Sequence, residues 1–241
     1  MIIDSFNRTP ADKARAPGST VVGAFALENP MLLRVDLKDE VYMRTGTMIA
    51  YCGGIRFNRI GPFSNGMGKG LRKMMAGESG KVTIASGNGK LWLAHRAKII
   101  HLIRMRDEPV CINGTGLLAF EPTVAWDAQF IRKSMSFFTS RLCNIRLEGT
   151  GAVAITTHGQ PMIMRVTPDD PLITDPHATV AWSGSLETEL KVDFSLKSLI
   201  GRGSGEFSQM IFRGNGFVIL QPYEEKPYYR SDASGDSGDS G

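Results

Sequence analysis

The sequence has no long apolar run. The longest candidate, around Ile99 to Ile103, is interrupted by His101, whereas a helix needs roughly 20 apolar residues to cross a bilayer. The start lacks the basic and apolar segments of a secretory signal. Only three cysteines occur, none of them in a Cys-x-x-Cys spacing, and we expect them to be small buried thiols. We therefore expect a cytoplasmic protein in a reducing compartment, and leave open a peripheral position at a membrane.

Recognisable catalytic patterns are also lacking. The glycine-rich stretch from Gly66 to Gly70 fails the phosphate-loop pattern, because Gly70 stands where serine or threonine is needed. The four histidines form no His-x-His pair, which disfavours a cupin-like metal site. No Gly-x-Ser-x-Gly nucleophile elbow is present. We therefore expect a protein that is not an enzyme and needs no cofactor, with a cupin-like enzyme whose site is unrecognised as one alternative.

Acidic residues are missing from one stretch of a chain whose formal net charge is +4. None lies between Glu40 and Glu78. Basic patches of this kind can bind phosphate, nucleic acid or an anionic membrane surface, and the alternative is a solvated face that keeps the protein in solution. A second basic cluster comprises Arg96, Lys98, Arg104 and Arg106. The candidate anion or partner surface consists of Arg56, Arg59, Lys69, Arg72 and Lys73.

The chain contains one pattern three times. The copies run from Val41 to Tyr51, from Val110 to Phe120 and from Leu172 to Trp182. Each copy opens on an aliphatic residue and closes on alanine followed by an aromatic ring. Self-similarity at a period of roughly 60 to 70 residues indicates one supersecondary unit used repeatedly.

A second element accompanies the first and consists of Gly-x-Gly followed by alternating apolar residues. It occurs at Gly87 to Gly89, Gly149 to Gly151 and Gly214 to Gly216. The glycines predict positive φ in the tight turn of a hairpin. The alternation after them predicts strands with one buried face. The residues expected to point inward are Leu91, Leu93, Val153, Ile155, Val218 and Leu220.

The last strand carries apolar residues on both faces. Phe217 and Ile219 alternate with the inward positions. A strand with two apolar faces is either central in a sheet or covered by another molecule. Phe217 and Ile219 are therefore candidate subunit contacts.

The rest of the chain divides simply. We expect a loose N-terminal arm over residues 1–20, a single β domain over 21–223 and a disordered polar tail over 224–241. The connections between copies predict short helical turns, which lie at 71–75, 134–140 and 194–200.

Several of these features together resemble a known family. Gly77 to Ser79 and Gly205 to Phe207 carry a Gly-Glu pair before a strand, a Gly-x-Gly element and a second strand. With the alanine–aromatic endings, this is similar to the altered inheritance of mitochondria protein 24 family, from about Val21 to Gln221. The middle copy departs from the pattern, since Thr139 to Leu142 replaces the Gly-Glu pair. The resemblance implies a fold like that of the tryptophan RNA-binding attenuation protein, and it carries over no ligand-binding residues.

These observations lead to one set of expectations. The fold should be all-β, a three-repeat β-prism or double-stranded β-helix with short connecting helices. The function should be that of a non-enzymatic scaffold or protein-interaction module, which forms a homo-oligomer and binds an unidentified protein partner. The alternative is a binder of anions, nucleic acid or an acidic membrane surface through the basic patch.

Overall fold

The computed structural model describes residues 21–59, 82–130, 143–192 and 208–225. Within these ranges the regular secondary structure is entirely β-strand, which confirms the predicted all-β class. No helix of the described residues is long and apolar enough to cross a membrane. The predicted N-terminal arm, the three predicted helical turns and the tail beyond Glu225 lie outside the described residues. The strands are β1 (Val21–Val22), β2 (Phe25–Asn29), β3 (Leu32–Leu37), β4 (Glu40–Arg44), β5 (Met48–Arg59), β6 (Val82–Leu93), β7 (Ile99–Arg106), β8 (Val110–Asn113), β9 (Leu117–Phe120), β10 (Val124–Phe130), β11 (Cys143–Thr157), β12 (Met162–Val166), β13 (Leu172–Thr174), β14 (Thr179–Ser183), β15 (Glu187–Val192), β16 (Ser208–Arg213) and β17 (Gly216–Leu220).

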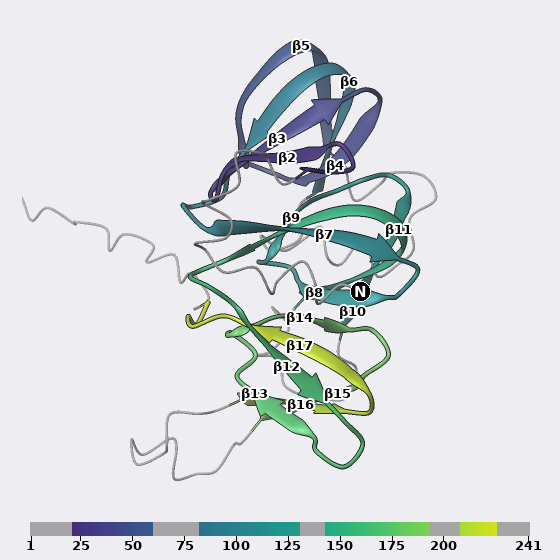
Figure 1. Cartoon of the computed structure of the whole chain (residues 1–241), viewed down its shortest axis with the longest axis vertical. Coiled ribbons are helices and arrows are strands. Elements are labelled where there is room, and N and C mark those ends of the chain that lie inside the picture. Colours follow the sequence, from purple (N-terminus) through teal and green to yellow (C-terminus); the bar gives the residue numbers. More distant parts are fainter. Residues whose placement is uncertain (1–20, 60–81, 131–142, 193–207, 226–241) are drawn as a thin grey trace, which may run out of the picture.

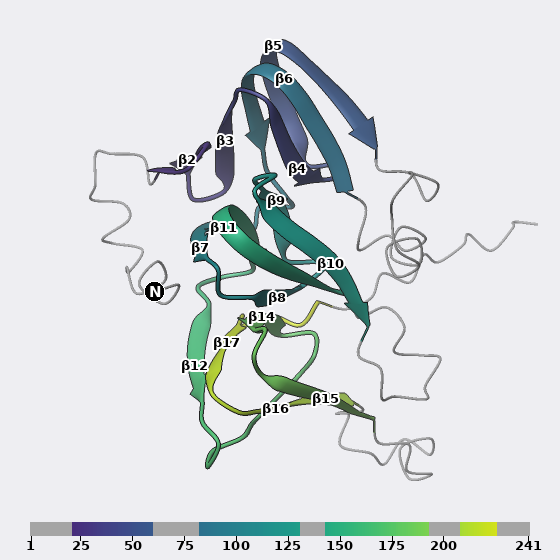
Figure 2. The ribbon, with the colours of Figure 1, turned by 90° about the vertical axis from the view of Figure 1, so that its right-hand side faces the viewer.

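The strands form one 14-stranded sheet and one 3-stranded sheet. The order in the large sheet is β1-β2-β3-β6-β4-β9-β11-β8-β14-β17-β12, with β5, β7 and β10 attached beside it, and the order in the small sheet is β13-β16-β15. Among the described strands this order is an open path. Figures 1 and 2 show a tall stack, with β5 and β6 at one end and β15 and β16 at the other.

Three groups of antiparallel strands follow one another along the stack. In the first group, β6 pairs with β3, β4 and β5. In the second, β11 pairs with β7, β8, β9 and β10. In the third, β17 pairs with β12 and β14, while β16 pairs with β13 and β15. Two further ladders join the groups, β4 with β9 and β8 with β14.

The first two Gly-x-Gly elements bend strands, the third separates β16 from β17, and none of the three closes a hairpin. β6 runs unbroken through Gly87, and β11 runs unbroken through Gly149. The two halves of β6 bond to different partners, β4 before the bend and β3 after it. The prediction of a tight turn between paired strands is therefore wrong. The predicted positive φ is confirmed, at 123° for Gly87 and 105° for Gly149, because a strand that bends sharply needs a residue without a Cβ at the bend.

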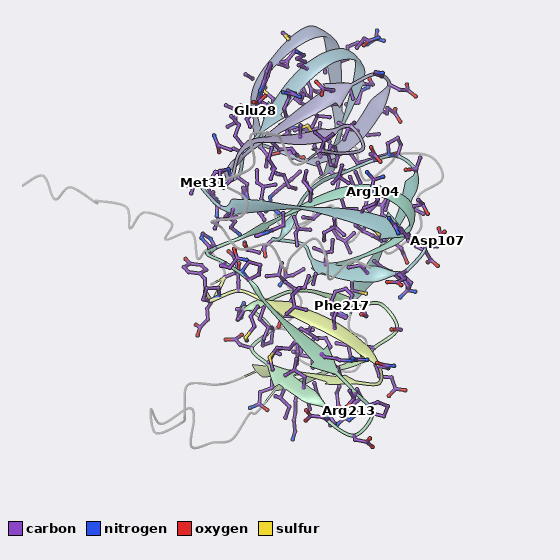
Figure 3. All side chains as sticks on the ribbon, viewed as in Figure 1. Glu28, Met31, Arg104, Asp107, Arg213 and Phe217 are labelled. Carbon is purple, nitrogen blue, oxygen red and sulfur yellow. The ribbon has the colours of Figure 1, made fainter. Side chains whose placement is uncertain are left out.

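The core follows the predicted alternation. Its side chains form three clusters, which lie around Phe25, Phe120 and Phe212, and side chains fill the stack along its length (Figure 3). Each leucine or phenylalanine that is fully buried contributes about 2 kcal/mol to folding. Of the residues predicted to point inward, Leu220 is half-buried and the others are buried: Leu91, Leu93, Val153, Ile155 and Val218.

The two apolar faces of β17 are accounted for within the chain. The strand is central, because it pairs with β12 on one side and β14 on the other. Phe217 is 8% exposed and Ile219 is 0% exposed, and both pack in the cluster around Phe120. Figure 3 shows Phe217 on the side of β17 that faces the middle of the stack. Neither side chain is therefore available as a subunit contact, which corrects that candidate role.

Candidate functional site

The most unusual polar side chain in the described chain is that of Lys98, which is buried. Lys98 follows a turn between β6 and β7 in which Arg96 and Ala97 both have left-handed backbone conformations, with φ of 51° and 54°. The backbone N–H of Lys98 closes the turn by donating to the carbonyl oxygen of His95 at 3.0 Å. Left-handed residues other than glycine cost on the order of 1 kcal/mol each, so the surroundings must hold this turn. The turn directs Lys98 inward, where its side chain is 1% exposed.

Glu225 supplies the counter-charge for this lysine. Lys98 Nζ donates to Glu225 Oε1, and the backbone N–H of Glu225 donates to the carbonyl oxygen of His177 at 3.0 Å. His158 Nε2 lies 3.5 Å from the same carboxylate oxygen, and the His158 ring centroid lies 4.0 Å from that of Tyr223. Glu225 falls in the tail predicted to be disordered. The structure instead fastens it to the body.

Further positive groups surround the pair. Arg44, at the end of β4, donates from Nη1 to the carbonyl oxygen of Gly114 at 2.6 Å. Its pKa is lowered, first by burial and then by repulsion from Arg96. Burial also lowers the pKa of Lys98, although its hydrogen bond to Glu225 opposes the shift. Glu225 acts against the lowered pKa of both cations and is therefore the counter-charge of the cluster.

This arrangement is suited to holding chain segments together. Lys98 comes from the β6–β7 turn, His158 follows β11, and Glu225 follows β17. A buried ion pair adds little net stability compared with an apolar contact, but it is costly to break from one side. The cluster therefore ties the segment after β17 to the first two groups of strands. We name it the Lys98 anchor, consisting of Arg44, His95, Arg96, Lys98, His158 and Glu225.

Folding stability should fall as the pH is lowered from about 6.5 to about 4, because of His95. The pKa of His95 is lowered to about 4, first by burial and then by Arg44, Lys98 and Arg96. The unfolded chain takes up this proton near the ordinary value of 6.5 and the folded chain only near 4, so acid favours unfolding in that window. His95 is partly exposed to solvent, which limits the loss to about 1 to 2 kcal/mol.

Urea unfolding of the wild type and of His95→Gln at pH 7.5 and pH 4.5 measures this loss. The variant should lose less stability between the two values than the wild type, because glutamine binds no proton. Equal losses in the two proteins would assign the acid sensitivity to other groups.

Metal-binding side chains are dispersed in the described part of the chain. No three His, Cys, Asp or Glu side chains gather there as a metal site requires. His101 is buried, and its Nε2 lies 2.8 Å from Thr157 Oγ1.

Cys111 is buried, as expected of the thiols, and burial raises its pKa. Cys52 is exposed on β5, so the expectation is wrong for that residue.

The two members of the predicted basic surface that the structure describes do not share a face. Arg56 and Arg59 are both exposed on β5, but they are separated by an odd number of positions, so strand alternation turns them to opposite faces. The second basic cluster is divided as well, because Lys98 is buried whereas Arg104 is exposed on β7 (Figure 3). Three members of the predicted surface lie outside the described residues: Lys69, Arg72 and Lys73.

The structure exposes apolar side chains that the sequence had not singled out. On β5, Ile49 is 62% exposed and Tyr51 is 48% exposed, and the Tyr51 ring centroid lies 5.3 Å from that of Phe57. On β13, Ile173 is 57% exposed. The matching residues of the second copy are buried, Leu118 and Phe120 for β5 and Cys111 for Ile173, so composition alone did not distinguish them. The signal that could have indicated exposure was the order of the copies, because the first and third copies each have a neighbouring copy on one side only.

Comparison with known proteins places this fold. An X-ray crystal structure of a protein from Streptococcus pyogenes is similar, with a TM-score of 0.66 and 23% identity over 84% of this chain and 93% of that chain. At that identity the likeness shows the fold alone. No curated protein matches the sequence. The Mitochondrial biogenesis AIM24 family matches over residues 26–223, which confirms the resemblance seen in the sequence, and the chain belongs to this family.

Proposed function

We propose that this chain is a non-enzymatic scaffold that self-associates through an exposed sheet edge. The observation that carries the proposal is β5. Among the described strands it pairs with β6 alone, and it presents Ile49 and Tyr51 to solvent. An edge strand offers unpaired N–H and C=O groups to another strand, and proteins usually protect such edges with charges, prolines or covering segments. Exposed apolar residues on an open edge are therefore suited to an interaction.

The proposed architecture is a three-repeat β-prism of the double-stranded β-helix kind. Its support is that the three matching sequence segments occupy similar places. They supply β4 with the start of β5, β8 with β9, and β13 with β14. The first strand of each segment pairs antiparallel with the strand that precedes a Gly-x-Gly element or contains it, β6, β11 and β16 respectively. Such a rigid repeated frame presents surfaces at fixed spacing, as a scaffold requires.

A non-enzymatic role is supported by the chemistry of the Lys98 anchor. Its carboxylate is engaged by Lys98 Nζ and lies beside His158, so it is held in contacts within the chain. Arg56 and Arg59 face opposite sides of β5, so these two side chains do not form one anion-binding patch.

Light scattering of the purified protein at tens of micromolar should give a mass of more than one chain. Tyr51→Lys places a charge on the open edge and should reduce the mass to that of one chain. Met162→Lys is the matched control at another open edge, because Met162 is apolar and 56% exposed on β12, which pairs with β17 alone among the described strands, and the mass of this variant should equal that of the wild type. A wild type that stays monomeric throughout this range would exclude self-association.

A further inference from the structure

The two ladders between groups of strands follow the same rule. At the first, β4 pairs with β9 through Tyr42 opposite Phe120 and Met43 opposite Ala119. Tyr42 is the second residue of the first copy, Val41 to Tyr51, and Phe120 is the last residue of the second copy, Val110 to Phe120. Met43 is the third residue of the first copy, and Ala119 is the alanine that precedes the final aromatic residue of the second copy.

The second ladder repeats that register with different residues. Between β8 and β14, Cys111 lies opposite Trp182 and Ile112 lies opposite Ala181. These are again the second residue opposite the last, and the third opposite the alanine. The ladder extends by one pair, with Val110 opposite Ser183. Two junctions of different sequence thus use one antiparallel register.

Two strands of the matching segments, one from the first copy and one from the third, have no neighbour of this type within the described chain. β5, from the first copy, pairs with β6 alone, and β13, from the third copy, pairs with β16 alone. Figure 1 shows the two strands at opposite ends of the stack. Each carries an exposed apolar side chain at the position that the register uses, Tyr51 on β5 and Ile173 on β13.

We propose that these two edges are the complementary halves of a third ladder, formed between two copies of this chain. This inference rests on the proposed self-association and names its surface. β13 of one molecule pairs antiparallel with β5 of the next. By the register of the two internal ladders, Ile173 lies opposite Tyr51, Thr174 lies opposite Ala50, and Leu172 lies opposite Cys52.

Side-chain packing at the first internal ladder shows what covers the aromatic ring. Tyr42 of β4 stacks on Phe120 with ring centroids 5.0 Å apart and an interplanar angle of 7°. Phe120 is supported from the side by Trp126, at 6.0 Å. Tyr51 is supported in the same way by Phe57 at 5.3 Å, but its open face has no such cover in the described chain. In the proposed contact Ile173 takes the place of Tyr42.

The symmetry of the contact follows from its two different halves. Each molecule has one β5 edge and one β13 edge, so the interface is head-to-tail, and each added molecule exposes a fresh edge. Because the edges lie at opposite ends of the stack (Figure 1), the molecules should add end to end, as a continuation of the internal order of strands.

Crosslinking tests the register, since Cys52 is native and exposed. Under mild oxidation, Leu172→Cys should form a ladder of covalent multimers through Cys52 of the next molecule. The same variant with Cys52→Ser should lose the ladder. Ile173→Cys, which shifts the thiol by one residue and to the other face of the strand, should give at least a tenfold lower yield. Equal yields from the two cysteine positions, or no multimers from Leu172→Cys, would overturn the proposed register.

Mixing tests the head-to-tail arrangement without relying on a disulfide. Tyr51→Lys blocks the β5 edge, and Ile173→Lys blocks the β13 edge. Each variant alone should have the mass of one chain, and an equimolar mixture should show a twofold higher mass, because one intact edge of each kind remains. If the wild type associates but the mixture stays at one chain, or if Ile173→Lys associates like the wild type, the β13–β5 contact is wrong and self-association by another surface stands. A monomeric wild type would overturn both proposals.

Discussion

Replacing Gly87 with alanine should destabilise the fold by about 3 to 5 kcal/mol, from backbone strain and overpacking together. Gly87 has a φ of 123°, in a region that residues with a side chain rarely adopt. An added Cβ would also lie 2.0 Å from the carbonyl oxygen of Gly54. That oxygen belongs to the backbone of the paired strand β5, so relief requires the two strands to separate at their common bend. The melting temperature should fall by roughly 10 °C or more.

Substitutions at two other glycines, Gly54 and Gly46, distinguish the cost of the positive φ from the cost of the steric clash. Gly54→Ala meets nothing within 4 Å, and Gly54 is not among the glycines with positive φ, so it should change stability by less than about 0.5 kcal/mol. At Gly46 the φ is 81° and the added Cβ also meets nothing within 4 Å, so strain alone should cost about 1 kcal/mol. Thermal and urea unfolding of the three variants gives the ranking. If Gly87→Ala were no worse than Gly46→Ala, the close approach of β5 and β6 would not limit stability.

The strands were predictable because their signal is local. Alternation of apolar residues identified the buried faces around Leu91 and Val153, and both residues are buried as expected. The glycines of the Gly-x-Gly elements predicted positive φ, which Gly87 has. Sequence could not tell a hairpin from a bent strand, because both need the same residue. The difference lies in which distant strands pair with each half, β4 and β3 in the case of β6, and that is a property of the whole fold.

The polar cluster was not predictable for the opposite reason. Lys98 and Glu225 are separated by 127 positions, and neither belongs to a motif. Lys98 resembled a member of a basic surface cluster and Glu225 resembled the start of a polar tail. Burial of the lysine arises from the strained turn at Arg96 and Ala97, and left-handed conformations of residues other than glycine leave no mark on composition. The exposure of Tyr51 was not predictable either, because Phe120, the matching residue of the second copy, is buried.

Replacing Glu225 with glutamine should be the most damaging isosteric change at the Lys98 anchor. Glutamine keeps the shape of the side chain but removes the charge, which leaves an ammonium that is 1% exposed without its counter-ion. Breaking a buried pair from one side costs about 3 kcal/mol. Glu224→Gln is the matched control, because it removes the same charge from the neighbouring exposed residue and should change stability by less than about 0.5 kcal/mol.

A second change identifies the buried charge as the cause of this loss. Lys98→Met in the Glu225→Gln background removes the unpaired ammonium and should restore most of the stability, because methionine has a similar volume and leaves no buried charge. The single variant Glu225→Gln should also gain stability as the pH rises toward 10.5, the ordinary lysine pKa. Burial lowers the pKa of Lys98, so the folded protein releases the lysine proton at a lower pH than the unfolded chain does, and a rising pH favours the folded state. Urea unfolding at pH 7 and pH 9.5 measures both effects. A double variant no more stable than Glu225→Gln would show that the carboxylate acts through His158 and not as the partner of Lys98.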